Sequence, residues 1–194
     1  MYQYVFTRDC KDLKRLFEGM GEMNIDLDPN AKTVKKRPYK LAHKYKELVN
    51  KEINNLIVAS IIYPINQSEW KSSMVIKPKN HDPKKLRICL DFWCLNKVTL
   101  IDPFPTPFAG EIINEVTGHE CHAFTCGFSS YNQVVIAKED QPKSTFVTKF
   151  GAFSYRVMPF GLKNALVVVS RIVVKAFQKY MYKMMEDYFD DWTI

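Results

Sequence analysis

Two adjacent carboxylates near the C-terminus give the clearest chemical signal in this sequence. Asp190 and Asp191 follow Tyr188 and Phe189 in an apolar, aromatic setting, where burying charge is costly unless the carboxylates hold something positive. Mg2+ ions take oxygen ligands, and two of them about 4 Å apart can clamp the attacking and leaving oxygens of a phosphoryl transfer. That chemistry normally needs a third carboxylate from elsewhere in the chain. The alternative is a simple polar turn, where Asp is common.

A basic run between positions 32 and 51 is the second candidate. It contains Tyr39 and Tyr45, a single acid, Glu47, and eight basic residues: Lys32, Lys35, Lys36, Arg37, Lys40, Lys44, Lys46 and Lys51. Such a strip can follow the phosphates of a nucleic acid, and it can equally be the solvated face of a helix. The net charge of +7 favours a polyanionic partner but serves solubility as readily.

Length and composition indicate a folded protein away from membranes. With 194 residues and 46% hydrophobic content, the chain can bury a core as one domain or two small lobes. No run approaches the roughly 18 apolar residues of a membrane span, and the N-terminus lacks the pattern of a signal peptide. We therefore expect an intracellular protein, cytoplasmic or nuclear, with no membrane partner, and the sequence leaves its oligomeric state open.

The cysteines favour a reducing compartment. There are five, an odd number that is spread thinly along the chain. Two pairs have four residues between them, and two histidines lie near the second pair, which suggests a zinc site as an alternative: Cys89 with Cys94, and Cys121 with Cys126, near His119 and His122. Zinc knuckles prefer closer pairs, and these cysteines lie in apolar runs typical of strands, so we favour strands.

Apolar periodicity predicts the elements that position these residues. A short helix is predicted near Leu13 to Met20, and a longer one over 44–58. Strands over 74–77 and 86–92 flank a turn at 80–83 and form a hairpin, with Leu86, Ile88, Leu90 and Phe92 on one face.

The second half continues with further strands and helices. Three prolines (Pro103, Pro105 and Pro107) precede a helix over 111–116 that Gly118 can close. A helix over 165–183 leads into the strand that holds Tyr188. The predicted strands are 122–126, 134–136, 145–148 and 152–157, with a turn at 150–151. Helices mixed with antiparallel hairpins indicate an α+β fold.

Ordered motifs over most of the chain resemble one family. They are Arg37-Pro38-Tyr39, Ile61 to Ile65 with Ser68-Glu69-Trp70, Lys85 to Asp91 with Leu95-Asn96-Lys97, Asp102-Pro103-Phe104-Pro105, Ser129-x-Tyr131-Asn132-Gln133, Tyr155 to Leu162, and Tyr188-x-Asp190-Asp191. From about Ile25 to Ile194 the sequence is similar to the reverse transcriptase of gypsy-type LTR retrotransposon polyproteins.

The resemblance implies a right-hand polymerase fold with fingers and an incomplete palm that carries an antiparallel sheet. It places a peripheral segment at 1–30, mainly fingers at 31–118 and mainly palm at 119–194. The palm of the family presents three aspartates to two Mg2+ ions and acts on an RNA or DNA template-primer and a dNTP. The implied reaction is RNA-directed DNA synthesis by two-metal nucleotidyl transfer.

The resemblance also implies roles for single residues. Asp190 and Asp191 would hold the metal ions, and the basic strip, with Lys35, Lys36, Arg37, Lys40 and Lys44, would bind nucleic acid. The nucleotide-binding roles are Phe189 under the primer end or incoming sugar, Tyr131 as the gate that senses the 2′-hydroxyl, Phe160 and Gly161 lining the pocket, and Lys79 and Arg87 on the triphosphate. Outside these motifs the three aromatic residues would be interpreted as ordinary core residues, and Lys79 as a solvated hairpin charge.

Cys126 departs from the family pattern at the position of the third aspartate. A free thiol, with a reference pKa near 8.5, is mostly protonated at neutral pH and is a soft ligand that Mg2+ disfavours. Removing one member of a catalytic unit usually costs orders of magnitude in rate. We therefore predict a polymerase relative without useful catalysis.

Other departures indicate the same decay. The family has a small residue, Arg and Pro where this chain has Ser130, Trp93 and Leu166, and Val168 to Ser170 also differ. Asp187 replaces an apolar residue and is predicted to point toward the core. The sequence ends three residues after Asp191, so we expect a short last strand and an open sheet edge, without the thumb and RNase H domain of the family.

Two other hypotheses stay open. In the first, the chain remains an enzyme because Asp190, Asp191 and either Glu139 or Asp187 supply enough oxygen ligands. In the second, it is a non-catalytic nucleic-acid-binding module that uses the basic strip and exposed aromatic residues.

Overall fold

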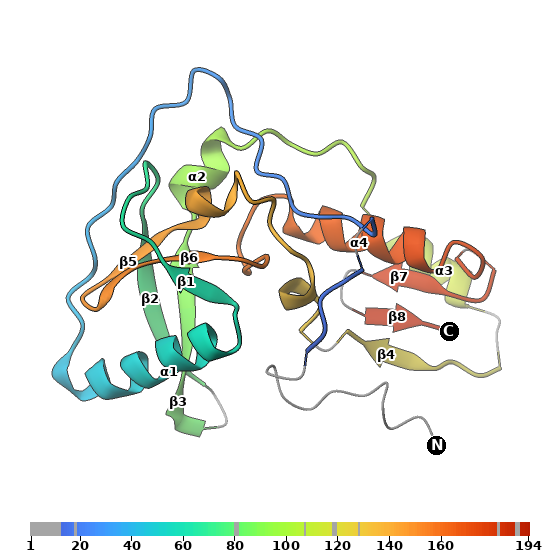
Figure 1. The fold of residues 1–194 in the computed structure, drawn as a ribbon. Coiled ribbons are helices and arrows are strands. Elements are labelled where there is room, and N and C mark those ends of the chain that lie inside the picture. The colour runs from blue at the N-terminus through green and yellow to red at the C-terminus, as the bar shows by residue number, and fades with distance from the viewer. Residues whose placement is uncertain are drawn as a thin grey trace.

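Two β-sheets organise the chain (Figure 1). The computed structural model describes residues 13–17, 19–79, 82–106, 108–117, 120–127, 129–181, 183–188 and 191–194. One sheet has five strands in the order β1-β6-β5-β2-β3, and the other has three in the order β4-β8-β7. Among the described strands, the pairings are antiparallel except that of β2 with β5. The predicted α+β fold with antiparallel hairpins is confirmed.

The long hairpin of the first sheet is the predicted one. Strands β2 (Ser72–Lys79) and β3 (Asp82–Asp91) pair antiparallel, with Met74 opposite Leu90. Both strands are longer than predicted. Only residues 80–81 of the predicted turn lie between them, and these two are outside the described residues. Phe92 is not a strand residue. It precedes helix α2 (Trp93–Val98) and is buried.

Aromatic packing joins the remaining strands of this sheet. These strands are β1 (Ile62–Pro64), β5 (Phe146–Thr148) and β6 (Gly151–Tyr155). The fully buried ring of Phe146 lies 5.8 Å from Phe153 and 5.6 Å from Tyr155, measured between centroids. Residues 134–136 do not form the predicted strand and make only isolated bridges, one of which pairs Val135 with Val157.

Helix α1 (Lys46–Val58) contacts β1 and β3 of the five-stranded sheet, and its buried residues are Val49 and Ile53. Its apolar residues recur at helical spacing, and the helix begins after a 3-10 turn, His43–Tyr45. The helix predicted over 44–58 is confirmed apart from this first turn.

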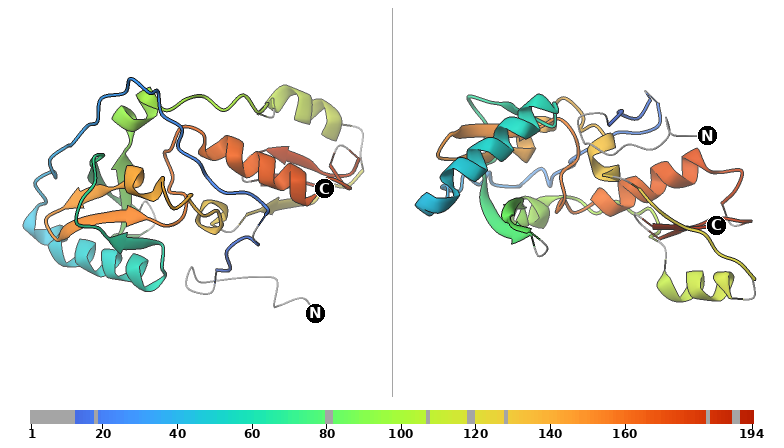
Figure 2. Two further views of the ribbon diagram at one scale, coloured as in Figure 1. Left: turned by 45° about the horizontal axis from the view of Figure 1, so that its top comes forward. Right: turned by 90° about the horizontal axis from the view of Figure 1, so that it is seen from below.

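Two helices lie on opposite sides of the three-stranded sheet (Figure 2). They are α3 (Ala109–Val116) and α4 (Ala165–Ala176), and the strands are β4 (Phe124–Cys126), β7 (Glu186–Tyr188) and β8 (Asp191–Thr193). Helix α4 ends well before position 183, so the predicted length was wrong, and Tyr180 beyond it is exposed. The short β8 is the central strand, which leaves β4 and β7 at the edges.

No helix in the described part of the chain has the length and hydrophobicity that crossing a membrane requires. Residues 13–17 and 19–20 form no helix either, so the prediction of a short N-terminal helix was wrong there. This N-terminal segment instead bonds to a segment from the second half of the sequence: the Leu16 N–H donates to the Gln133 carbonyl at 3.1 Å. Met23 and Ile25 lie in the core.

A buried carboxylate fixes this N-terminal segment. Asp140 is 5% exposed and accepts hydrogen bonds from the Ile25 N–H at 2.7 Å and from Lys143 Nζ at 2.5 Å. Lys143 Nζ also donates to the Ile25 carbonyl at 2.7 Å. Because buried polar groups are costly without partners, these bonds depend on one another.

We predict that Asp140→Ala lowers the free energy of unfolding by about 2 to 3 kcal/mol, because it leaves the Ile25 N–H without its acceptor and Lys143 without its counter-charge. The measurement is urea unfolding followed by circular dichroism. Glu139→Ala, at the exposed neighbouring position, is the matched control and should change stability by less than about 0.5 kcal/mol. Equal effects of the two variants would contradict the structural role of Asp140.

Candidate metal and nucleotide site

Strand register brings Cys126 next to Asp191. In the three-stranded sheet, Cys126 on β4 is the direct partner of Asp191 on β8, which is also the partner of Tyr188 on β7. Directly opposite residues have Cα atoms about 4.5–5.5 Å apart and side chains on the same face. Cys126, Asp191 and Tyr188 therefore form one cross-strand row, and all three are exposed.

The other face of this sheet packs on the core. Asp187 is the partner of Trp192, and because strand side chains alternate, both point away from the cross-strand row. Asp187 is buried, and the Trp192 ring lies 5.9 Å from Phe177, just beyond α4. The predicted inward orientation of Asp187 is confirmed. The hypothesis that Asp187 joins Asp191 as a metal ligand is wrong, since the two carboxylates lie on opposite faces.

A second row on the exposed face lies beside α3. Glu186 pairs with Thr193 there, and burial, followed by the nearby Glu115 carboxylate, raises the pKa of Glu186. Cys121 and His122 help to line a cavity of about 190 Å3 at this place. Within the described ranges, no group of three or more His, Cys, Asp and Glu side chains is arranged to hold a metal ion. The zinc alternative has no support from them, and His119 lies outside the described residues.

The described donors of the row fit magnesium poorly. They are the Cys126 thiol and the Asp191 carboxylate, whereas Mg2+ demands hard oxygen ligands in near-ideal octahedral geometry. Two predicted site residues, Asp190 and Phe189, lie outside the described residues. Glu139 is exposed.

The predicted nucleotide-pocket residues form a packed aromatic group. Tyr131, in the 3-10 turn Ser130–Gln133, is 4% exposed, and its ring centroid lies 4.3 Å from that of Phe160, which is 64% exposed. Gly161 has a φ of 95°, a conformation that L side chains rarely adopt. Asn96 of α2 donates to the Gly161 carbonyl at 2.7 Å. The pocket segment is thereby attached to α2.

The two predicted triphosphate residues lie on the long hairpin. Arg87 is an exposed residue of β3, opposite Lys77. Lys79 is the last residue of β2, and its side chain lies outside the described residues. Both assignments remain predictions.

The basic strip is mostly extended and does not form one helix face. Residues 34–36 run beside Lys71, with hydrogen bonds of 2.9 Å in both directions, and α1 begins only at position 46. Alternation along this extended stretch turns the Lys36 side chain inward and leaves Lys35 and Arg37 exposed, as Lys40 and Lys44 are. The interpretation of the strip as a solvated helix face is therefore wrong for residues 32–42.

Lys36 anchors the strip to the long hairpin. Its Nζ lies 2.6 Å from Asp91 Oδ2. The hydrogen bond with Lys36 lowers the pKa of Asp91, and the same bond raises the pKa of Lys36. Asp91 Oδ1 also accepts the Trp93 N–H at 3.2 Å, which connects the strip to the start of α2.

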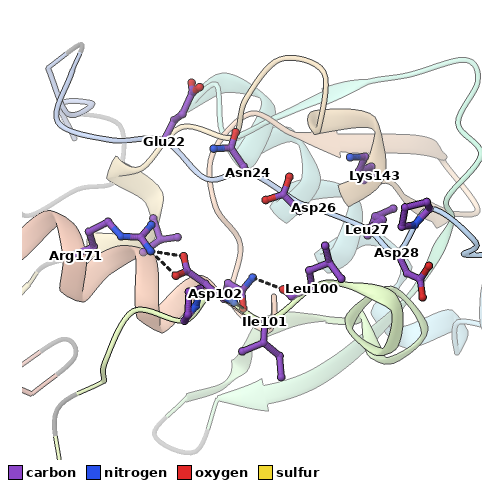
Figure 3. Close-up of a pocket in the computed structure, with 14 residues that line it drawn as sticks. Glu22, Asn24, Asp26, Leu27, Asp28, Leu100, Ile101, Asp102, Lys143 and Arg171 are labelled. Atoms are coloured by element: carbon purple, nitrogen blue, oxygen red, sulfur yellow. Dashed lines mark hydrogen bonds and ion pairs between the residues drawn. The ribbon is translucent and has the colours of Figure 1, made fainter.

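A second cavity lies elsewhere and holds none of the predicted site residues (Figure 3). It has a volume of about 710 Å3 and lies between residues 22–29, residues 100–103 and α4. Arg171 pairs with Asp102 there, and Asn164 donates to the Leu100 carbonyl at 2.8 Å. These contacts join the proline-rich segment to α4.

Comparison with known proteins decides the family. A scan against protein-family models finds no match. An RNA-directed DNA polymerase homolog from Oenothera berteroana is 36% identical over 109 residues, which cover 56% of this chain and 77% of that protein. The chain belongs to the reverse transcriptase family. The retrovirus-related Pol polyprotein from the Drosophila melanogaster transposon opus is 30% identical over 146 residues, 74% of this chain and only 14% of the polyprotein.

Solved reverse transcriptases share the fold. A mutant of the prototype foamy virus protease-reverse transcriptase superimposes with a TM-score of 0.82 at 15% identity, over 100% of this chain and 25% of the viral one. The foamy viral enzyme in complex with an RNA/DNA hybrid gives 0.79 at 17% identity, over 95% of this chain and 25% of that one. The predicted polymerase fold of this reverse transcriptase relative is confirmed.

Sequence reasoning missed the links that hold the candidate site residues together. Asp91 binds both Lys36 and the Trp93 N–H, and Asn96 binds the Gly161 carbonyl. These contacts join residues that are up to 65 positions apart, so no local pattern announces them. The contact of Lys97 with the Trp93 ring, by contrast, could have been predicted from the i, i+4 spacing of the two residues on one helix.

We predict that Asp191→Cys forms a disulfide with Cys126 on mild oxidation when the other cysteines are replaced by serine. Direct cross-strand partners lie within the Cα separation that a disulfide spans. Mass spectrometry of a non-reduced digest is the measurement. Thr193→Cys is the control, because its diagonal offset from Cys126 is too long to bridge. A crosslink of equal yield in both variants would refute the register.

We also predict a pH effect at Asp91. Because the folded-state pKa of Asp91 is lowered, its pairing with Lys36 stabilises fully above the unfolded-state pKa of about 3.9 and is lost as the pH falls through the folded-state value. The stability difference between the natural chain and Asp91→Asn should be about 1 kcal/mol or less near neutral pH and shrink below about pH 4. Thermal unfolding across this range measures it, and a difference that grows in acid would be inconsistent with the ion pair.

Proposed function

We propose that this chain is a reverse transcriptase relative that keeps the nucleic-acid-binding surface of the polymerase and has lost nucleotidyl transfer. The observation that carries the proposal is the register that sets Cys126 directly opposite Asp191. A thiol stands where the cross-strand row needs a second hard oxygen donor beside Asp191. The polyprotein relative is far longer than the region matched here, so its whole activity is no guide to this chain alone.

The metal chemistry that the family implies is a divalent-ion requirement, and in this proposal the described donors of the row, Cys126 and Asp191, suit Mg2+ poorly. A bound pair of Mg2+ ions would neutralise charge on the transferring phosphoryl group. Cys126 offers a thiol that is mostly protonated at neutral pH and soft when ionised. Asp187 cannot compensate, because its strand position turns it to the other face.

We assign the two sheets to the two lobes of the polymerase. The five-stranded sheet with α1 and α2 belongs mainly to the fingers over 31–118, and the three-stranded sheet with α4 belongs to the palm over 119–194. The assignment is supported by the long basic hairpin in the first unit and the cross-strand row in the second. The β5–β6 hairpin follows residue 118 in the sequence but pairs with strands of the five-stranded sheet. The boundary at 118 therefore does not divide the two sheets completely.

Nucleic-acid binding is the retained activity in this proposal. Lys35 and Arg37 point outward from an extended stretch, and their spacing of two residues suits a backbone of repeated phosphates. Phe160 supplies an exposed ring over the buried Tyr131. The complex of the foamy viral enzyme with an RNA/DNA hybrid supports template-primer as the partner class.

The test compares metal binding and primer extension in one pair of variants. The natural chain should bind Mg2+ weakly in calorimetric titration and should not extend a DNA primer on an RNA template. Cys126→Asp should raise the Mg2+ affinity by about tenfold or more, because it adds a second carboxylate beside Asp191. Cys121→Asp, at an exposed cysteine outside the row, is the matched control.

Two results would contradict the proposal. Template-dependent extension by the natural chain with Mg2+ would show that catalysis survives the cysteine. A Cys126→Asp variant with no gain in Mg2+ affinity over Cys121→Asp would show that the thiol does not occupy a ligand position.

A further inference from the structure

Trp93 is an exposed tryptophan at the start of α2. It is 61% exposed, whereas Trp70 is 7% exposed and Trp192 packs against Phe177. An exposed indole offers a ligand a large, flat aromatic face. The backbone N–H of Trp93 donates to Asp91 Oδ1, which anchors the start of α2.

A cation covers one face of this ring. Lys97, one helical turn later, places Nζ 3.7 Å from the Trp93 ring centroid. Such a contact orders the indole without burying it. The large exposed area then leaves the opposite face of the ring available for stacking.

The surroundings of Trp93 are basic and partly aromatic. Asp91 joins the Trp93 backbone to Lys36, so the segment that carries the exposed Lys35 and Arg37 is anchored to the start of α2. Asn96 of the same helix binds the segment that contains the exposed Phe160. Asp91 is the acid in this group, and its charge is already matched by Lys36.

We propose that Trp93 is a stacking platform for an unpaired base of a single-stranded nucleic acid whose phosphates lie along Lys35, Arg37 and Lys97. Single-strand binding sites combine aromatic faces with a cationic track in this way, since every base has a π-face and every nucleotide a phosphate. A duplex would keep its bases stacked on one another and offer none to the indole. This inference rests on the proposed nucleic-acid binding. It adds that Trp93 takes part and that the bound nucleic acid is single-stranded.

The experiment measures binding of two oligomers of equal charge to the full chain. The probes are a single-stranded adenosine RNA of about ten nucleotides and an abasic oligomer of the same length. Trp93→Leu should weaken binding of the RNA about tenfold and leave the affinity for the abasic oligomer unchanged, whereas Trp93→Phe should keep most of the RNA affinity. Indole fluorescence should be quenched by the RNA in the natural chain and not in the phenylalanine variant.

Control variants separate the contributions. Arg37→Gln should weaken both oligomers alike and reduce the salt dependence of binding, because it removes a phosphate contact and no stacking. Since Trp93 is largely exposed, its variants should keep the natural unfolding temperature, and this is checked first by circular dichroism.

The outcomes distinguish this inference from the proposed function. If neither oligomer binds, the proposed nucleic-acid binding is itself wrong. If both bind and Trp93→Leu affects them equally or not at all, binding is real and the stacking platform is refuted. A duplex RNA that quenches the indole as strongly as the single strand would also overturn the inference.

Discussion

The register of three short strands decides the chemistry of this molecule. Direct cross-strand pairing puts Cys126 and Asp191 side by side, and the two-residue period of a strand sends Asp187 to the opposite face. A shift of one residue would exchange these faces. The register is held by packing, because Trp192 and the buried Asp187 lie on the side that α4 covers. The fold thus presents the row to solvent whether or not its donors suit a metal ion.

The same separation between fold and chemistry explains how a polymerase fold persists with a thiol in the row. Cys126 is exposed, so replacing a carboxylate there changes ligand chemistry with little effect on packing. Core residues such as Phe146 and Ile25 have no such freedom, since large-to-small changes in a core cost several kcal/mol. A binding surface made of exposed lysines and an exposed indole is likewise independent of the metal ligands, and this is why nucleic-acid binding and catalysis are separable in the proposal.

Sequence reasoning predicted the elements whose signals are local. Alternation in residues 86–90 predicted the hairpin, and helical spacing predicted α1. It overextended α4 because the apolar spacing continues through Phe177 and Tyr180, although the helix ends at Ala176. It placed a helix near Leu16, where the backbone bonds to Gln133 instead. In both cases tertiary contacts outweigh a short amphipathic pattern. The inward turn of Asp187 was predictable because strand alternation needs no tertiary information.

No local sequence pattern predicted how the basic strip is connected to the segment that contains Phe160 and Gly161. Lys36 meets Asp91, Asp91 holds Trp93, and Asn96 on the same helix holds Gly161. These polar contacts attach the segment of Lys36 and the segment of Gly161 to one six-residue helix, α2, which also carries the exposed indole. Asp91 holds the start of α2, and Asn96 joins the helix to Gly161. A single-stranded nucleic acid bound along the basic residues would therefore meet an ordered Trp93 ring, with little further loss of side-chain entropy. That preorganisation makes α2 the element on which a retained binding function would depend, even in a chain whose cross-strand row no longer suits Mg2+.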